Sequence, residues 1–511
     1  MAGLRIAFRT DANEMIGTGH FMRCLTLADE LSLQGSDICF VSRGLPAHLR
    51  LMLDERQIPL RVLPALVSVE SMDELQHAHW LGTSQAHDAQ QTIHMVGTNK
   101  LDWLVIDHYA LDRRFETLLR SVTKNILVID DLADRVHDCD LLVDQNFYSN
   151  QEIRYQGIVP SHCQMLLGPT YALLRPEFKE ARQRMKFRSG EVRNILVFFG
   201  GVDADNYTGK ALEILTGLQL NIEMNVVIGE QHPNRIEIEK VCELHQLNCH
   251  VQTSQMATLM SKADLAIGAG GTTVWERFCL GLPSFCIATA ENQKQQLNEL
   301  QLAGYVNSEA EGELSTLALT NFLDNMSSQP ALLTRLSEKV ATLVDGAGST
   351  NTAAAIKEYM LHIRLANSQD ERNIFEWRNH PYIRSHSKNK DEIKWSSHQQ
   401  WFQERLNGKR GLVLIGEVKG AAVGVVRFDI QQSDAEVSIY LVPDSNFKGW
   451  GSLLLKKSES WLRQHYPSVL TLHAKVLPDN SPSIQLFSKL NYIANEQTSP
   501  LEFLKLVKSC Q

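Results

Sequence analysis

Hydrophobic and polar positions in the first part of the chain alternate between short apolar runs and longer amphipathic stretches. The apolar runs are of strand length and rich in Val, Ile, Leu and Phe. Each apolar run is followed by apolar residues at the spacing expected for a helix with one buried face. Alternation of this kind predicts βαβ units around a parallel sheet. The expected strands of this first domain are residues 5–8, 38–41, 103–107 and 125–130.

The alternation stops over residues 146–190, where turn residues such as Gly168 and Pro169 accompany scattered aromatic residues. It then resumes with a second series of apolar runs, which predicts a second doubly wound domain. The predicted boundaries are therefore 1–150 for the first Rossmann-like domain, 151–190 for a connecting segment and 191–360 for the second domain. The strands expected in the second domain are residues 194–199, 224–228, 263–267 and 284–287.

A different pattern begins after residue 360. Three consecutive strand-like runs with hairpin-length connections precede a helix, a further strand and a last helix. Consecutive antiparallel strands followed by helices predict a separate α+β domain over residues 362–511. The fold class predicted for the whole chain is α/β, with two doubly wound domains and then this α+β domain. Its expected elements are strands 412–418, 423–429, 436–441 and 470–476 and helices 449–465 and 483–490.

Composition narrows the class of protein. The chain has 511 residues, of which 43% are hydrophobic and 21% charged, as in an ordinary globular protein that buries sizeable cores. At roughly 100 to 200 residues per domain, this length favours about three domains. The 50 Lys and Arg residues are outnumbered by 59 Asp and Glu, and the net charge is −9. We therefore expect small-molecule ligands and no nucleic-acid partner.

The sequence contains few features that would indicate a membrane span, a secretion signal or disulfide bonds. No apolar stretch approaches the roughly 18 residues of a membrane span, and the N-terminal apolar run is soon broken by Arg9 and Asp11. The nine cysteines are scattered and form no Cys-x-x-Cys pair. The sequence predicts no membrane insertion, no disulfide framework and a cytoplasmic location.

A glycine-rich segment follows the first predicted strand, where Gly17 and Gly19 allow a tight turn before an amphipathic helix. This turn puts His20 in the first helical turn, at the crevice between two doubly wound domains. The positive end of the helix favours the neutral imidazole, which is the form that a general base needs. A surface or capping histidine is the alternative interpretation. The candidate binding residues of this segment are Arg9, Asp11, Gly17, Gly19 and Arg23.

Two more glycine loops lie in the second domain, each after a predicted strand. Their backbone amides can bind a phosphate, and the helix that follows residue 272 has its N-terminus suited to a diphosphate. Glu276, about one turn inside that helix, can accept hydrogen bonds from a ribose diol. Turn geometry without a ligand is the alternative for either loop alone. The candidate binding residues are Gly200, Gly201, Asp203, Asn206, Gly270, Gly271, Thr272 and Glu276.

Three motifs together resemble a known enzyme family. They read Arg-x-Asp-x5-Gly-x-Gly-His-x-x-Arg, Gly-Gly-x-Asp-x-x-Asn and Gly-x-Gly-Gly-Thr-x-x-Trp-Glu-Arg-x3-Gly-x-Pro, within residues 4–345. This set is similar to the nucleotide-sugar hydrolases of pseudaminic acid biosynthesis. The resemblance implies a glycosyltransferase-B-like pair of domains that releases UDP from UDP-2,4-diacetamido-2,4,6-trideoxy-β-L-altropyranose with inversion. It also implies that His20 is the base that activates water, with Tyr109 as a second catalytic candidate.

An insertion-like stretch, residues 67–99, precedes the segment Asp107-His108-Tyr109, which contains the second catalytic candidate.

No His or Cys cluster has metal-ligand spacing, and we predict no metal. The Asp-x-Asp pair Asp203 and Asp205 could instead hold a metal-diphosphate, although turn and capping carboxylates are the preferred interpretation. UDP is already a good leaving group, so a single base suffices without the proton donor of a paired-carboxylate glycosidase.

The third domain carries a second resemblance. Residues 441–454 look like the acetyl-CoA pyrophosphate loop of the GNAT superfamily of N-acetyltransferases, and residues 480–492 match its second signature. The resemblance covers about residues 362–500, and a helix N-terminus again offers amides to a diphosphate. Glu436, before the loop, is the candidate base, and a solvated strand charge is its alternative. The cofactor-binding candidates are Lys448, Gly449, Trp450, Gly451, Asn480 and Ser483.

Three residues depart from the GNAT pattern. Asn446 replaces the usual Arg or Gln, Phe487 stands where a tyrosine acid often occurs, and Asn491 replaces a customary glycine. With Phe487 unable to donate a proton to the thiolate product, Tyr492 or a bound water would take that role, and water is favoured.

The two resemblances together imply a bifunctional enzyme. Its substrates would be acetyl-CoA and a UDP-4-amino-4,6-dideoxy-N-acetyl-altrosamine. Acetylation of the 4-amino group would precede hydrolysis to UDP and 2,4-diacetamido-2,4,6-trideoxy-L-altrose, on the route to flagellin glycosylation. The alternative is a UDP-sugar-dependent glycosyltransferase with a non-catalytic acetyltransferase-like binding domain. The sequence predicts no particular protein partner.

Overall fold

The computed structural model describes residues 3–64, 73–97, 100–218, 220, 222–309, 313–408, 411–444, 449–495, 498 and 500–506. Contacts divide the chain into two compact units. One is Leu4–Ala353, and the other is Ala354–Gln511 together with Met1–Gly3. The division falls inside helix α14 (Gly348–Met360), a few residues before the boundary at 360 expected from the sequence. Each unit is described by itself.

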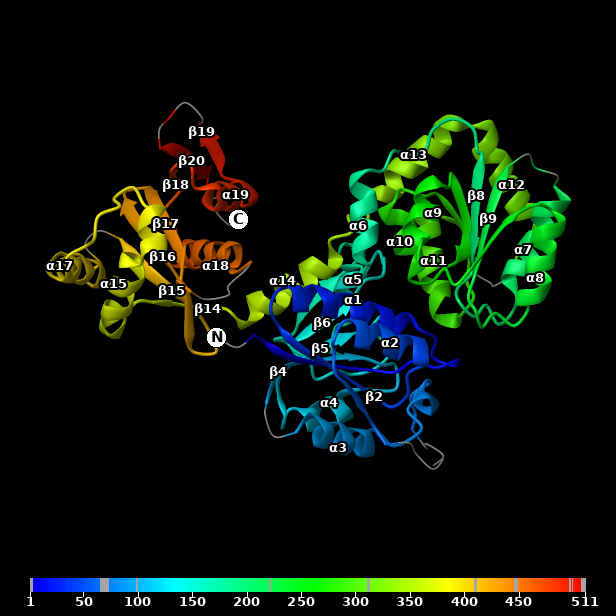
Figure 1. The fold of residues 1–511 in the computed structure, drawn as a ribbon, viewed down its shortest axis with the longest axis horizontal. Coiled ribbons are helices and arrows are strands. Elements are labelled where there is room, and N and C mark those ends of the chain that lie inside the picture. The colour runs from blue at the N-terminus through cyan, green and yellow to red at the C-terminus, as the bar shows by residue number, and fades with distance from the viewer. Residues whose placement is uncertain are drawn as a thin grey trace. The chain divides into compact units, whose positions relative to one another are not determined.

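The first sheet has seven parallel strands in the order β3-β2-β1-β4-β5-β6-β7. Every residue of β4 is buried, which explains its near-continuous apolar sequence, because strands covered on both faces do not alternate. Figure 1 shows α1 and α2 on one side of this sheet and α3 and α4 on the other. The strands are β1 (Arg5–Thr10), β2 (Asp37–Ser42), β3 (Leu60–Val62), β4 (Leu101–Asp107), β5 (Thr123–Ile129), β6 (Leu141–Asp144) and β7 (Gln164–Leu167). The helices are α1 (Gly19–Leu33), α2 (Ala47–Glu55), η1 (Ala78–Trp80), α3 (Gln85–Val96), α4 (Arg113–Leu119) and α5 (Gln151–Arg154).

The first domain extends beyond the boundary expected at residue 150. Strand β7 pairs with β6 and is the seventh strand of the first sheet, although it lies inside the expected connecting segment. It is a four-residue edge strand, too short to show a periodicity in the sequence. The connection to the second sheet therefore begins after residue 167, and it contains η2 (Pro169–Tyr171) and α6 (Pro176–Gln183).

The second sheet has six parallel strands in the order β10-β9-β8-β11-β12-β13. Helices cover both of its faces, with α9, α10 and α11 on one side and α7, α8 and α12 on the other (Figure 1). The strands are β8 (Asn194–Phe198), β9 (Glu223–Ile228), β10 (Asn248–Val251), β11 (Leu265–Ala269), β12 (Ser284–Ile287) and β13 (Asn307–Glu309). The helices are α7 (Tyr207–Gly217), α8 (Arg235–Leu244), α9 (Met256–Lys262), α10 (Thr273–Cys279), α11 (Glu291–Leu302), α12 (Thr316–Ser328) and α13 (Pro330–Ala341).

The order of both sheets reverses at one point, between β1 and β4 in the first sheet and between β8 and β11 in the second. Ligands of doubly wound sheets bind outside the carboxyl ends of the strands at this switch point. The three glycine segments singled out in the sequence follow β1, β8 and β11. All three are therefore located where such a fold binds its ligands.

The second unit is built on a mixed sheet with the order β14-β15-β16-β17-β18-β20-β19. Its central pair β17 and β18 is parallel, and its other neighbours are antiparallel. The predicted fold class, two doubly wound α/β domains and then an α+β domain, is confirmed. The strands are β14 (His362–Leu365), β15 (Leu412–Val418), β16 (Ala421–Gln431), β17 (Asp434–Leu441), β18 (Thr471–Val476), β19 (Ile493–Asn495) and β20 (Leu501–Leu506). The helices are η3 (Ser368–Asp370), α15 (Glu371–Asn379), α16 (Pro381–Ser385), α17 (Trp395–Leu406), α18 (Trp450–His465) and α19 (Ser481–Lys489).

Candidate functional site

The first switch point brings His20 against a buried carboxylate. Helix α1 starts at Gly19, so His20 stands in its first turn, and Asp107 ends the adjacent strand β4. The His20 Nδ1 atom lies 2.5 Å from Asp107 Oδ1. Because an anionic carboxylate only accepts hydrogen bonds, it fixes the proton on Nδ1 and leaves the Nε2 lone pair as a proton acceptor. Histidine held in this way is oriented as a general base.

Arg23 keeps this carboxylate charged. Its Nε atom lies 2.5 Å from Asp107 Oδ2, and its Nη2 atom lies 2.7 Å from Oδ1. Burial alone would raise the pKa of Asp107, but the charge of Arg23 and the hydrogen bonds from Arg23 and His20 lower that pKa well below its usual value. Asp107 therefore stays ionised across the whole neutral range.

Tyr109 and Asp131 complete the polar surroundings of His20. The Tyr109 hydroxyl donates to Asp131 Oδ1 over 2.5 Å, and Arg23 Nη1 lies 3.0 Å from Asp131 Oδ2. The rings of His20 and Tyr109 meet edge to face with their centroids 4.5 Å apart. Burial and the Asp131 charge raise the pKa of Tyr109 well above its usual value, so Tyr109 remains a phenol. The Asn292 amide from α11 also lies 3.4 Å from the Tyr109 hydroxyl.

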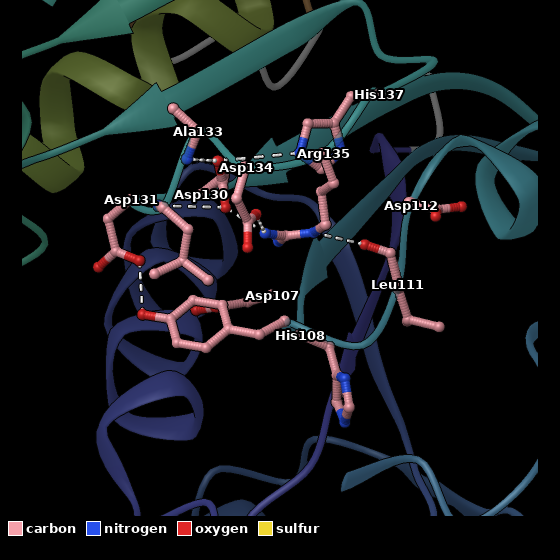
Figure 2. Close-up of polar contacts among 12 residues, drawn as sticks. Asp107, His108, Leu111, Asp112, Asp130, Asp131, Ala133, Asp134, Arg135 and His137 are labelled. Carbon is pink, nitrogen blue, oxygen red and sulfur yellow. Dashed lines mark hydrogen bonds and ion pairs between the residues drawn. The ribbon is translucent and has the colours of Figure 1, made fainter. Parts of the chain in front are cut away.

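A buried arginine ties the loop that carries Asp131 to the loop after β4. Arg135 pairs with Asp130 at 2.9 Å, and its Nε atom donates to the carbonyl oxygen of Leu111 over 2.9 Å (Figure 2). Its guanidinium carbon lies 5.7 Å from the centre of the Tyr109 ring. Burial alone would raise the pKa of Asp130, but Arg135 lowers it well below its usual value. These bonds fix Asp131 relative to Asp107.

His137 also holds the loop that carries Asp131, through contacts with two carboxylates. Its Nδ1 atom lies 2.7 Å from Glu116, and its Nε2 atom lies 3.8 Å from Asp130. Burial alone would lower the pKa of His137, but the two carboxylates raise it to about 9. The stability from this charge is therefore fully present below the unfolded value of about 6.5 and is lost as the pH rises through about 9.

Arg9 and Asp11, both expected to bind ligand, are instead committed to internal ion pairs. Arg9 is completely buried and lies 2.7 Å from Asp11 and 2.8 Å from Asp88. Asp11 also accepts a hydrogen bond from the Arg43 amide over 2.7 Å. The geometry makes Arg9 and Asp11 positioning residues that brace the end of β1 against the segment carrying Asp88.

The glycine turn before α1 is open. Gly17 has φ +75°, which side-chain-bearing residues rarely adopt, and its amide donates to the Asn13 carbonyl over 2.8 Å. A Cβ atom added at Gly17 or Gly19 would meet no heavy atom within 4 Å. Backbone conformation, and not packing, therefore explains a glycine at position 17.

In the second domain, the polar residues of the loop after β8 cap α7. Asp203 accepts hydrogen bonds from the amides of Tyr207 and Thr208 over 2.9 and 2.8 Å and lies 3.2 Å from His232. Asn206 accepts from the Gly209 amide over 3.1 Å. Both side chains are thus occupied by the fold. The turn itself holds Gly200, at φ +114°, and Gly201.

The loop after β11 packs closely and leads to Glu276. A Cβ atom on Gly270 would lie 2.4 Å from Leu297, which requires glycine there, whereas Gly271 and Thr272 are less constrained. Glu276 lies 3.4 Å from Arg175, and its side chain is 16% exposed. Burial raises the pKa of Glu276, against the effect of Arg175. A partly open acidic side chain at a switch point suits the ribose contact expected from the sequence.

In the second unit, Glu436 stands where the two parallel strands separate. Pairing between β17 and β18 ends at Glu436 and His473, although both strands continue. The two strands therefore diverge beyond Glu436. Glu436 accepts a hydrogen bond from Lys475 over 2.9 Å and is 40% exposed. The hydrogen bond and the charge of Glu436 raise the pKa of Lys475.

Helix α18 begins at the expected cofactor loop. Gly449 is the N-cap residue with φ +81° and has no side chain to cap the helix, and Trp450 is buried. Gly451 follows with space beside it, whereas Lys448 and Asn446 lie outside the described residues. Asn480 accepts from the Ser483 amide over 3.1 Å and so caps α19.

Tyr492 is engaged in an internal hydrogen bond. Its hydroxyl donates to Glu459 over 2.7 Å, and the side chain is buried beside Phe487. Burial and Glu459 raise the pKa of Tyr492 well above its usual value. Protonation of the thiolate product by water therefore stays a prediction.

A group of arginines gathers on the face of the sheet that carries Glu436. Arg427 on β16 is paired in register with Ser438 on β17, so the two side chains share the face of Glu436. Burial, then the charges of Arg427 and Arg384, lower the pKa of Arg378. Among the described residues, Arg378 Nη1, Arg384 Nε and the Tyr440 hydroxyl are buried without a hydrogen-bond partner. Such a cluster suits a polyanionic ligand.

The structure adds three residues that sequence reasoning did not assign. Asp107 was visible only as the last residue of a predicted strand, and Asp131 only as part of an acidic loop. Asn292 lies in a polar helix with no motif that marks it. Strand-end position was the one available signal, because carboxyl ends of parallel strands face the ligand site.

Three general features concern the part of the chain that the structure describes. No group of three or more His, Cys, Asp or Glu side chains there is placed to hold a metal ion. The eight cysteines it includes are free thiols. None of its helices has the length and apolarity to cross a membrane.

Comparisons with protein families define the class. Residues 372–492 match the acetyltransferase (GNAT) family, and residues 194–346 match the glycosyltransferase family 28 C-terminal domain. Both matches are to enzyme families, so the chain is an enzyme that joins a domain like that of glycosyltransferase family 28 to a domain like those of the GNAT acetyltransferases.

Individual relatives cover both parts. The chain is 28% identical to the UDP-2,4-diacetamido-2,4,6-trideoxy-β-L-altropyranose hydrolase of Campylobacter jejuni, over 59% of this chain and 98% of the relative. It is 29% identical to the acetyltransferase PseH of the same species, over 28% of this chain and 89% of the relative. The uncharacterized protein MJ1062 of Methanocaldococcus jannaschii is 24% identical over 96% of both chains. The chain is therefore a fusion of a hydrolase-like region with an acetyltransferase.

Proposed function

We propose that the chain acetylates the 4-amino group of a UDP-linked 4-amino-4,6-dideoxy sugar and then hydrolyses the product to UDP and the free diacetamido sugar. The observation that carries the hydrolase assignment is the His20–Asp107 pair at the switch point of the first sheet. The likeness to the hydrolase and to PseH, each over most of the relative, supports the two substrates. A cytoplasmic location and a route to pseudaminic acid for flagellin belong to the same proposal.

In the hydrolysis, His20 Nε2 takes a proton from water as the water oxygen attacks the anomeric carbon. The bond from that carbon to the diphosphate oxygen breaks, and the electron pair leaves with UDP, so the anomeric configuration inverts. Asp107 stabilises the imidazolium that forms, because its carboxylate faces Nδ1 at 2.5 Å. Tyr109, which donates to Asp131, orients the sugar beside His20.

The UDP moiety is assigned to the second sheet, with its diphosphate at the glycine loops and its ribose at Glu276. Replacing Glu276 by alanine should weaken UDP binding by about 1.5–3 kcal/mol, the scale of hydrogen bonds to a charged group. Calorimetric titration with UDP measures this. Glu239→Ala, an exposed carboxylate of α8 in the same domain, is the control and should leave the dissociation constant unchanged. Equal affinity of Glu276→Ala and wild type would move the ribose contact elsewhere.

In the acetyl transfer, the diphosphate of the UDP-sugar lies at the cluster of Arg378, Arg384 and Arg427, where three cations lie near a buried hydroxyl. Acetyl-CoA binds at the N-terminus of α18, where the N-cap residue is Gly449 and the first backbone amides of the helix suit a diphosphate. Glu436 accepts the amine proton, directly or through water, as the nitrogen attacks the thioester carbonyl. The thiolate leaves and is protonated by water.

Replacing Glu436 by glutamine should lower acetylation at neutral pH by about 10²–10⁴-fold, because the amine then has no base. The rate should recover partly at high pH, where the amine loses its proton to solvent. Release of CoA measured against pH checks this, and Asp434→Asn, two residues earlier on the same face of β17, is the control. Tyr492→Phe should cost little. A wild-type rate for Glu436→Gln at neutral pH would assign the base to another residue.

The glycosyltransferase alternative is tested by incubating the UDP-sugar without any acceptor. A hydrolase releases UDP at its full rate under these conditions. A transferase releases UDP only when a sugar or lipid acceptor is added.

A further inference from the structure

A group of aromatic side chains packs around His20. Trp80, at the end of η1, stacks on Tyr109 with ring centroids 5.5 Å apart and an interplanar angle of 25°. His20 meets Trp80 edge to face at 6.0 Å. His77 lies 4.7 Å from Trp80 and 5.2 Å from Tyr109. We call Trp80 and His77 the aromatic wall of the site.

The aromatic wall belongs to the stretch that reads as an insertion in the sequence, of which residues 73–97 are described. This stretch is firmly attached to the switch point. Asp88 of α3 holds Arg9 and Arg43 with contacts of 2.8 and 2.5 Å. Gln85 accepts a hydrogen bond from the Asp112 amide over 3.0 Å. The aromatic wall is therefore held at a fixed place beside His20.

Both residues of the aromatic wall keep side-chain surface or polar groups that contacts within the fold do not occupy. Trp80 and His77 are both half-buried, so each keeps part of its surface exposed. Neither ring nitrogen of His77 forms a hydrogen bond with another described residue. Burial, together with the positive charge of Arg135, lowers the pKa of His77, which keeps this imidazole neutral. A neutral imidazole offers one donor and one acceptor.

We propose that the aromatic wall recognises the sugar of the UDP-sugar, with Trp80 packing on the apolar C5-methyl side of the 6-deoxy ring and His77 hydrogen bonding to an acetamido group. This inference rests on the proposed hydrolase function. An indole provides a large apolar surface that gains most from a methyl group and less from a hydroxymethyl group. Trp80 and His77 are then specificity-determining residues, distinct from the base and from the UDP contacts.

The test uses two UDP-diacetamido sugars that differ only in a methyl or a hydroxymethyl group at C5. Wild type should prefer the methyl sugar in kcat/KM. Trp80→Ala should reduce that preference by about 10-fold, the scale of one methyl group in a pocket. Trp80→Phe should retain most of it, and His87→Ala, an exposed residue of α3 whose ring contacts Gln91, should leave it unchanged. UDP affinity should be the same in all four proteins.

His77→Ala should lower kcat/KM for the diacetamido sugar by about 10-fold, with a smaller effect on the sugar that carries a free 4-amino group. A purely structural role would reduce the rates for all sugars equally or lower UDP affinity, and either result would overturn the proposal. Calorimetry with each UDP-sugar and with UDP alone is run alongside. If wild type releases no UDP, the hydrolase function fails, and the binding preference for the methyl sugar and its loss in Trp80→Ala still decide the role of the wall.

Discussion

Replacing His20 by alanine is expected to lower UDP release from the diacetamido UDP-sugar by about 10²–10⁴-fold, the range for a positioned acid or base. His20 is the group near the switch point whose Nε2 atom is left free to accept a proton, because Nδ1 faces Asp107 at 2.5 Å. The loss should fall on kcat, since the UDP contacts proposed above lie on the second sheet. Release of UDP under saturating substrate measures it.

The second activity of the same chain supplies an internal control. Acetyl-CoA-dependent acetylation by His20→Ala should proceed at the wild-type rate, because Glu436 lies in a separate compact unit. His87→Ala, an exposed histidine of α3, should hydrolyse normally. Near-normal UDP release by a folded His20→Ala protein would remove His20 from the base role.

Replacing Asp107 by asparagine is expected to lower kcat for hydrolysis by a similar factor, on the order of 10²–10⁴. Asparagine can present its amide N–H to the imidazole, which favours the proton on Nε2 and removes the free lone pair. It also removes the negative charge that stabilises the imidazolium and leaves Arg23 with Asp131 as its remaining carboxylate contact. Hydrolysis measured as kcat and KM separately checks this, with KM expected to change little.

A matched control shows whether the effect is specific to the carboxylate that faces His20 or would follow the loss of another carboxylate in the same domain. Asp138→Asn changes a partly exposed carboxylate that pairs with Arg120, in the same domain but away from His20. Its rate should equal that of wild type. The melting temperature of Asp107→Asn shows whether the buried Arg23 still has a stable environment. If a folded Asp107→Asn protein kept the wild-type kcat, the carboxylate would have no part in orienting His20.

Much of the architecture follows from periodicity and glycine placement. The central strands β1, β4, β8 and β11 are largely apolar along their length, and buried parallel strands have that signature. The glycine loops after β1, β8 and β11 marked both switch points. Edge strands such as β7 have four residues and no clear alternation, so their place depends on pairing with a neighbour. The connecting segment was consequently predicted to start too early.

The sequence alone could not predict which side chains contact one another. His20 and Asp107 are 87 positions apart, and Arg9 and Asp88 are 79 apart. Their contact depends on the strand order, which brings β1 beside β4 and α3 over the same sheet. Polar residues in a motif therefore indicate a site, but whether Arg9 faces a ligand or an internal carboxylate is decided by the fold.

The most direct measurement of the proposed activity is mass analysis of the products formed in ¹⁸O-water from UDP-4-amino-4,6-dideoxy-N-acetyl-altrosamine, with and without acetyl-CoA. With acetyl-CoA, the full-length protein should give one CoA per sugar, a free diacetamido sugar carrying ¹⁸O, and unlabelled UDP. This labelling reports attack of water at the anomeric carbon. An acetylated UDP-sugar that stays intact without a further acceptor, or ¹⁸O in the UDP, would contradict the assignment of the chain as an acetyltransferase joined to an anomeric hydrolase.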